Sequence, residues 1–157
     1  MKYAFKAVEA ICIVLLVVFI GYMAGNTGNS NKTPEEIEAA VTQSMDMNGL
    51  KKADNGAFRT QFGYDMGEFA GVVYYKSESI MDVREMLIIK LPEGNDGEAV
   101  SEKLRTYTDE KAALYESYAP DEFFLLSNSV IEVKGNYLFF CVADEAAVAY
   151  ESFCDAL

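Results

Sequence analysis

The residue types that most often perform enzyme chemistry are scarce in this chain. It contains no histidine, which excludes a histidine-based triad, a histidine general base and a histidine-ligated zinc ion. It also lacks a GxSxG or SxxK nucleophile motif, a phosphate-binding loop and a GxGxxG fingerprint. Carboxylate chemistry is therefore the main catalytic chemistry that the sequence leaves open.

Carboxylates occur in adjacent pairs and in one turn-like segment, and neither arrangement is specific. The pairs are Asp121–Glu122 and Asp144–Glu145, and neighbouring residues on a helix point in different directions. The segment PEGNDGE, residues 92–98, resembles part of a calcium loop but lacks the alternating acidic ligands and the closing glutamate of an EF-hand. A turn followed by a helix cap accounts for it. We therefore expect no catalytic residue, no cofactor and no metal site.

The cysteines are Cys12, Cys141 and Cys154, and we expect no disulfide between the last two. Cys141 lies near the end of a predicted strand, and Cys154 lies well inside the helix predicted after it. Residues in two packed layers are roughly 10 Å apart, which exceeds the reach of a disulfide. Both cysteines are expected to be small buried hydrophobic residues.

Aromatic residues could form a binding surface. The chain has ten Tyr and ten Phe, and alternation along a strand sends about half of its side chains to each face. If helices cover only one face of the sheet, Tyr75, Tyr137 and Phe139 are exposed and form a surface for a partner or a second copy. Alternatively, a short helix and residues 119–128 wrap around the sheet and bury them.

The net charge is −12, which argues against nucleic acid as a partner. An acidic surface repels phosphate backbones and anionic lipid headgroups. The simplest interpretation is a solvated, soluble surface, and a cation-binding role is the alternative.

Apolar periodicity, caps and turn residues predict the elements that position these side chains. Thr33, Pro34 and Glu36 form a capping box with proline at the first helical position. Gly135–Asn136 lies between two apolar runs and predicts a two-residue hairpin. The expected elements are helices over 33–48 and 53–62, strands over 68–76 and 84–91, a helix from about 96 to Pro120, hairpin strands within 129–143 and a helix capped by Asp144.

This order, α-(α)-β-β-α-β-β-α, predicts an α+β domain. Hairpins require antiparallel pairing, so the simplest arrangement is a two-layer fold. It has a four-stranded antiparallel sheet with helices packed mainly on one face.

The N-terminal residues predict a transmembrane helix. The run AICIVLLVVFIGYMAGN, residues 10–26, has no charged residue, and Lys2 and Lys6 before it place the N-terminus in the cytoplasm. A helix over residues 3–24 spans about 33 Å, enough to cross a bilayer. Tyr22 or Phe19 would occupy the −3 position of a signal-peptidase site, which requires a small residue.

We therefore expect a single-pass signal-anchor whose partner is the lipid bilayer, and the alternative is secretion after cleavage. The expected organisation is a cytoplasmic start and signal-anchor over 1–24, a flexible tether over 25–32 and an extracytoplasmic α+β domain over 33–157. The tether is rich in Gly, Asn, Ser and Thr, a composition typical of flexible linkers.

The C-terminal third resembles a known family. Tyr118, Pro120 and Asp121 precede a strand, and KGNY, residues 134–137, leads into an apolar strand and a final helix. This arrangement resembles a family of small, mostly Firmicutes proteins, catalogued as domain of unknown function four-three-five-eight. The resemblance covers about residues 34–157. It implies a membrane- or lipid-anchored extracytoplasmic domain in a Gram-positive bacterium, and it implies no activity and no catalytic residues.

The sequence favours a binding or assembly module at the cell envelope, without catalysis, whose partner could be another envelope protein. A solute- or cation-binding module using the acidic surface is the first alternative. A carboxylate-dependent hydrolase of wall material is the second.

Overall fold

The computed structural model describes Leu16 and residues 28–157. Apart from Leu16, the predicted signal-anchor over residues 1–24 lies outside the described residues. Within the part that is described, no helix has both the length and the apolar character needed to cross a membrane.

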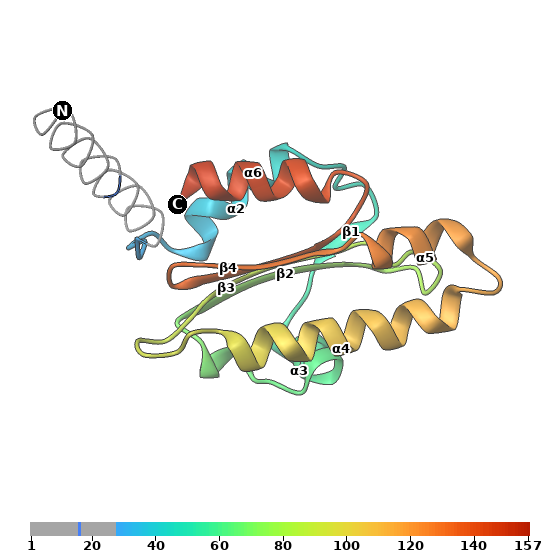
Figure 1. Cartoon of the computed structure of the whole chain (residues 1–157), viewed down its shortest axis with the longest axis horizontal. Helices are drawn as coiled ribbons and strands as arrows, with labels where there is room; N and C mark the ends of the chain where they lie inside the picture. The colour runs from blue at the N-terminus through green and yellow to red at the C-terminus, as the bar shows by residue number, and fades with distance from the viewer. Residues whose placement is uncertain (1–15, 17–27) are drawn as a thin grey trace, which may run out of the picture.

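A five-stranded antiparallel sheet forms the middle layer, in the order β1-β2-β3-β5-β4 (Figure 1). The strands are β1 (Leu50–Lys52), β2 (Gly71–Ser77), β3 (Glu85–Lys90), β4 (Val130–Lys134) and β5 (Tyr137–Val142). The four predicted strands are present, but the prediction of a four-stranded sheet was wrong. The additional strand, β1, has only three residues, too few to show an alternating pattern in the sequence.

Helices cover both faces of the sheet, so the prediction of helices mainly on one face was also wrong (Figure 1). The helices are α2 (Pro34–Gln43), α3 (Asn55–Phe62), α4 (Glu98–Tyr115), α5 (Pro120–Ser127) and α6 (Ala146–Ala156), with a 3-10 turn at Met66–Glu68. α2 and α6 lie on one face, and α3 and α4 lie on the other. The reason lies in β3 and β5, which are apolar on both faces and therefore need cover on both sides.

The sheet separates two hydrophobic cores. Alternate residues of β3 contribute to different cores: Leu87 and Ile89 pack toward α3 and α4, and Met86 and Ile88 pack toward α2 and α6. This is the period-two alternation of a strand buried on both sides.

Local sequence signals position the helix ends and the hairpin. Glu36 accepts a hydrogen bond from the Thr33 backbone N–H at 2.6 Å, as the capping box predicts. Gly135 adopts a positive φ of 59° in the two-residue turn between β4 and β5. Pro120 is the first residue of α5, a helix that the sequence analysis missed.

Residues 28–32, which we call the strap, lie against the domain. The Ser30 backbone N–H donates to Asn136 Oδ1 at 2.8 Å, and Asn136 Nδ2 donates to the Ser30 carbonyl at 3.0 Å. Ser30 Oγ donates to the carbonyl of Leu157 at 2.9 Å. The Lys32 carbonyl accepts from the Tyr137 hydroxyl and, at 2.7 Å, from Lys90 Nζ. The strap is therefore fastened to the end of the sheet that carries the Gly135 turn.

Candidate functional site

Two of the three residues predicted as an interaction surface are not available to a partner. Tyr137 and Phe139 are both 0% exposed, because α6 covers them and the Phe139 ring lies 4.9 Å from that of Phe153. Tyr75 is half-buried, and its hydroxyl donates to Glu38. Tyr137 and Phe139 are buried, as the alternative expected, but α2 and α6 cover them rather than a short helix and residues 119–128.

The cysteines and acidic segments have structural roles. Cys141 and Cys154 are free thiols, and burial raises the pKa of the Cys141 thiol to about 12. In the 92–98 segment, the Asn95 and Asp96 side chains accept hydrogen bonds from backbone N–H groups of the same turn. Among the described residues, no group of three or more His, Cys, Asp or Glu side chains could hold a metal ion.

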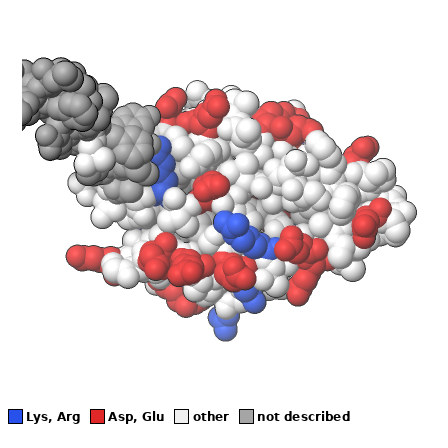
Figure 2. All heavy atoms as spheres, viewed as in Figure 1, with Lys and Arg blue, Asp and Glu red and all other residues white. Residues whose placement is uncertain are grey.

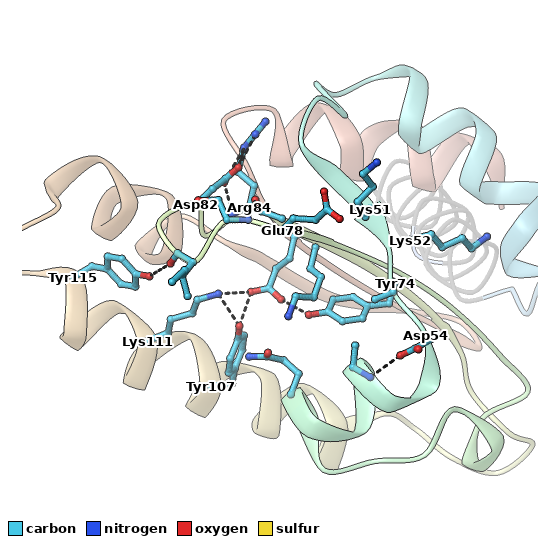
Figure 3. Close-up of a pocket in the computed structure, with 18 of the residues that line it drawn as sticks. Lys51, Lys52, Asp54, Tyr74, Glu78, Asp82, Arg84, Tyr107, Lys111 and Tyr115 are labelled. Carbon is cyan, nitrogen blue, oxygen red and sulfur yellow. Dashed lines mark hydrogen bonds and ion pairs between the residues drawn. The ribbon is translucent and has the colours of Figure 1, made fainter.

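An open cleft of about 760 Å³ lies on the α3–α4 side of the sheet (Figure 3). Its walls are β1, the C-terminal half of β2, the start of β3, one side of α3 and the second half of α4. The loop between β2 and β3, residues 78–84, forms part of its rim. The volume lies within the range of about 300–1,000 Å³ that is typical of small-molecule sites.

The buried carboxylate of Glu85 lines this cleft, and Figure 3 labels its three partners, Tyr74, Tyr107 and Lys111. Glu85 is 2% exposed. Its Oε2 accepts from the Tyr74 hydroxyl at 3.0 Å, and its Oε1 accepts from Tyr107 at 2.7 Å and Lys111 Nζ at 3.0 Å. Lys111 Nζ also lies 2.8 Å from the Tyr107 hydroxyl. The negative charge is therefore paired and hydrogen-bonded, as a buried charge must be.

The same network favours the protonated form of the Tyr74 and Tyr107 hydroxyls. Burial, followed by the negative charge of Glu85, raises the pKa of Tyr74 and of Tyr107 well above the ordinary value of a phenol. Both hydroxyls are therefore neutral hydrogen-bond donors at neutral pH, and neither is suited to act as a general base.

Lysine side chains line the cleft next to this network. Lys51 on β1 and Lys76 on β2 are directly opposite each other in the antiparallel register. Lys76 is half-buried, and its other neighbour in the register is Glu85. Figure 2 shows carboxylates spread widely over one face of the molecule with few basic groups among them. The cleft lining combines five basic side chains with five carboxylates, so it is less acidic than the chain as a whole, whose net charge is −12.

The rim of the cleft is apolar and firmly attached. Ile80 is 92% exposed and Leu114 is 67% exposed. The Tyr115 hydroxyl donates to the Ile80 carbonyl at 2.9 Å, which connects the loop to α4. A cleft with polar groups at the floor and apolar groups at the rim matches an amphiphilic ligand.

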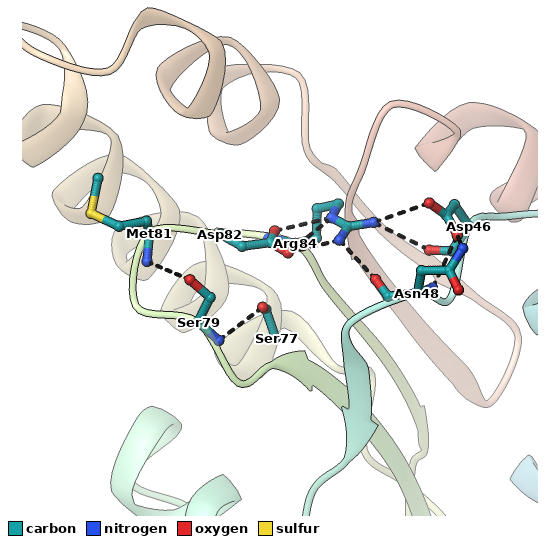
Figure 4. A network of polar contacts seen from close by, with 7 residues as sticks. All are labelled: Asp46, Asn48, Ser77, Ser79, Met81, Asp82 and Arg84. Atoms are coloured by element: carbon teal, nitrogen blue, oxygen red, sulfur yellow. Dashed lines mark hydrogen bonds and ion pairs between the residues drawn. The ribbon is translucent and has the colours of Figure 1, made fainter.

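Arg84 fixes the other end of the loop (Figure 4). Its guanidinium donates to Asp82 at 2.7 Å and 3.0 Å, and to the Asn48 carbonyl at 2.9 Å. Asp82 is partly buried, which raises its pKa, but the hydrogen bonds from Arg84 outweigh this and lower the pKa overall. The contact joins the β2–β3 loop to the segment that precedes β1.

Sequence reasoning did not find this cleft. Glu85 belongs to the predicted strand over residues 84–91, Tyr107 to the apolar side of the long helix and Lys111 to its solvent side. A charged residue inside a strand that is otherwise continuously apolar was the available signal, because such a residue must be paired once the sheet is covered.

The fold and the cleft define a three-layer α+β domain with a ligand-sized opening on one helical layer. The chain belongs to the family described as "Domain of unknown function (DUF4358)", whose model matches residues 43–143. The matched segment contains every residue that lines the cleft and excludes α6. No curated protein and no solved structure matches the chain.

Proposed function

We propose that this chain is a membrane-anchored binding module of a Gram-positive cell envelope, with its domain outside the cytoplasmic membrane. The cleft is the binding site, and binding occurs without catalysis. The uncharged run over residues 10–26, with Lys2 and Lys6 before it, supports the anchor. The observation that carries the binding role is the cleft itself, which combines a ligand-sized volume, fixed polar groups at its floor and an apolar rim.

The position of the strap supports this arrangement. The strap is attached at Asn136, Tyr137 and Lys90, whereas the cleft begins at the opposite ends of β2 and β3, at Lys76 and Glu85. The six residues of β3 separate these two ends by about 17 Å. An anchor that precedes the strap would therefore join the domain at the end of the sheet opposite to the Lys76–Glu85 end of the cleft.

The chemistry of the floor favours binding over catalysis. Glu85 has hydrogen bonds on both oxygens, and the raised pKa values keep Tyr74 and Tyr107 protonated. Asp54 accepts from the Ala57 backbone N–H and caps α3, and Asp82 pairs with Arg84. Three of the five carboxylates that line the cleft are thus occupied by structural partners, and Glu78 and Glu110 are the two that a carboxylate-dependent hydrolase would have to use.

Assembly with another envelope protein is the second form of this proposal. It is favoured by the exposure of Ile80, Met81 and Leu114 at or beside the rim of the cleft. Exposed apolar residues around a cavity are typical of a surface that a partner covers.

The absence of tryptophan allows a direct binding test. The variant Leu114→Trp places a unique fluorophore at the rim, where the side chain is exposed and a larger ring is tolerated. Full-length protein in an uncharged detergent is screened against a library of small polar, apolar and amphiphilic compounds. We expect at least one class to shift the tryptophan emission in a saturable manner.

A matched pair of variants locates the binding. Ala57 lines the cleft, so Ala57→Phe fills it, whereas Ala113 is exposed on α4 and does not line it. In the Leu114→Trp background, Ala57→Phe should abolish the signal and Ala113→Phe should leave it unchanged. A signal that survives Ala57→Phe, or no saturable signal from any compound, contradicts the small-ligand form of the proposal. Cross-linking in native membranes then tests the protein-partner form.

Anchoring is tested separately by membrane fractionation and by protease treatment of intact cells. The proposal expects membrane-bound protein whose domain is cleaved from outside. Released protein would support signal cleavage instead.

A further inference from the structure

We propose that Lys51 and Lys76 bind an oxyanion, a carboxylate or phosphate, carried by an amphiphilic ligand of the cleft. This inference rests on the proposed binding function and specifies the ligand's chemistry. It follows from two lysines that lie directly opposite each other in the sheet and form no ion pair within the described residues.

The first step of the argument is the register of β1 and β2. Lys51 and Lys76 are direct Cα partners in an antiparallel pair, which places their Cβ atoms about 5 Å apart on one face. Like charges directly opposite each other destabilise a sheet. Their mutual repulsion is unfavourable, and an anion that contacts both ammonium groups would relieve it.

The second step is that no carboxylate of the described residues lies within ion-pair distance of either lysine, although Glu78 and Glu85 also line the cleft. Within residues 28–157, neither lysine forms an ion pair, although Lys52 next to Lys51 pairs with Glu38 at 2.7 Å. Glu85 is opposite Lys76 on the other side, but its oxygens accept from Tyr74, Tyr107 and Lys111 instead. Lys76 is also half-buried, which increases the benefit of a counter-charge.

The third step is location. Both lysines line the cleft, together with Ile80 and Leu114 at its apolar rim. A ligand whose oxyanion contacts the two ammonium groups can place a short apolar chain against Ile80 and Leu114. Lysine binds carboxylate and phosphate as a point charge, so the shared chemistry is an oxyanion.

Butyl phosphate is the probe, and 1-butanol is its uncharged counterpart. Both are titrated into full-length Leu114→Trp protein in an uncharged detergent, with tryptophan emission as the signal. We expect butyl phosphate to bind more tightly than 1-butanol, and its affinity to fall as salt concentration rises.

Removing the charge of each lysine in turn tests whether that lysine binds the oxyanion. In the same background, Lys76→Gln should weaken butyl phosphate binding about tenfold, since this lysine is half-buried. Lys51→Gln should weaken it about threefold, because Lys51 is exposed. Lys103→Gln makes the same charge change on an exposed position of α4 outside the cleft and should have no effect. Without ligand, neither cleft variant should lower the melting temperature, because each removes a like-charge pair.

The possible failures are distinguishable. If an uncharged compound binds in a manner that Ala57→Phe abolishes, but butyl phosphate binds no tighter than 1-butanol, the oxyanion inference is wrong and the binding function stands. If Lys76→Gln and Lys51→Gln bind butyl phosphate as well as Lys103→Gln does, the assignment of the lysines is wrong. If nothing binds in the cleft, the oxyanion inference and the small-ligand form of the proposed function both fail.

Competition then identifies the source of the oxyanion. Displacement of butyl phosphate by inorganic phosphate supports the site and assigns it to a soluble anion. Displacement by dihexanoylphosphatidylglycerol, with no effect of inorganic phosphate, supports the site and assigns it to a lipid headgroup.

Discussion

Glu85 is the residue on which the geometry of the cleft depends most. Its carboxylate is buried, and it joins β3 to β2 through Tyr74 and to α4 through Tyr107 and Lys111. A buried ion pair is weak evidence for net stability, but removing one partner leaves the other without compensation. Glu85 and Lys111 therefore have to be considered together.

The first prediction concerns Glu85→Gln. This change leaves the Lys111 ammonium without its counter-charge, and we expect the free energy of unfolding to fall by about 3 kcal/mol. Urea denaturation followed by circular dichroism measures it. Glu102→Gln, on an exposed position of α4, is the control and should change the value by less than about 0.5 kcal/mol. Equal stability of the two variants would show that Lys111 does not depend on Glu85 for its counter-charge.

The second prediction is a loss of stability at alkaline pH. The folded state raises the pKa of Tyr74 and Tyr107 above the unfolded value of about 10, by burial first and then by the charge of Glu85. Above pH 10 the folded state retains protons that the unfolded chain has lost. The stability that these two tyrosines contribute is therefore complete below pH 10 and falls above it, by about 1.4 kcal/mol per pH unit for each tyrosine.

Denaturant unfolding at a series of pH values tests this slope. Tyr107→Phe should reduce the slope by about 1.4 kcal/mol per pH unit, because the contribution of one shifted phenol is removed. Tyr118→Phe is the control, since its ring is exposed in the folded chain, and its slope should equal that of the unmodified protein. An unchanged slope in Tyr107→Phe would contradict the linkage.

At the scale of elements, the rim of the cleft depends on one arginine. Arg84 joins the β2–β3 loop to the segment before β1 through Asp82 and the Asn48 carbonyl. We predict that Arg84→Gln increases amide hydrogen exchange in residues 46–50 and 78–84 at least severalfold, with little change in α6. Arg59→Gln is the control, because Arg59 is largely exposed and its contact with Asp65 is 3.9 Å long. Uniform exchange changes across the domain would indicate a global rather than a local effect.

Much of the element order could be predicted from the sequence, because it depends on local signals. The capping box at Thr33, the turn at Gly135 and the apolar runs of β2, β3 and β5 all act within a few residues. Two elements could not be found in this way. β1 is too short to show a pattern, and Pro120 was interpreted only as the end of one helix although it also begins another.

The arrangement of the helices and strands in space depends on contacts between residues far apart in the sequence. The β3 sequence EMLIIK is apolar at consecutive positions, which in retrospect requires helices on both faces. Because a two-layer fold was expected, Tyr137 and Phe139 were predicted to be exposed. The same expectation left no second helical layer, and the cleft forms between that layer, α3 and α4, and the sheet. The lysine pair could not be predicted either, because it depends on the register of a strand that the sequence did not reveal.

At the scale of the whole molecule, the strap defines the lower limit of the stable domain. Residues 28–157 retain the bonds of Ser30 to Asn136 and Leu157 and of Lys32 to Tyr137 and Lys90. We predict that fragments 28–157 and 33–157 are both soluble and folded. The shorter fragment should be less stable by about 2 kcal/mol, because these hydrogen bonds are lost. Denaturant unfolding of the two fragments measures the difference, and equal midpoints would contradict a stabilising strap.

The attachment of the strap also has a mechanical consequence. A pull on the chain from its N-terminal side reaches the domain first at Ser30, which is bonded to the hairpin turn and to the last residue of the chain. If a partner holds the cleft, the force acts along the length of β5. The hydrogen bonds that pair β5 with β3 and β4 then resist it together. The strap is the weakest part of this path. Tension should therefore detach residues 28–32 while the cleft, at the far end of the strands, retains its shape.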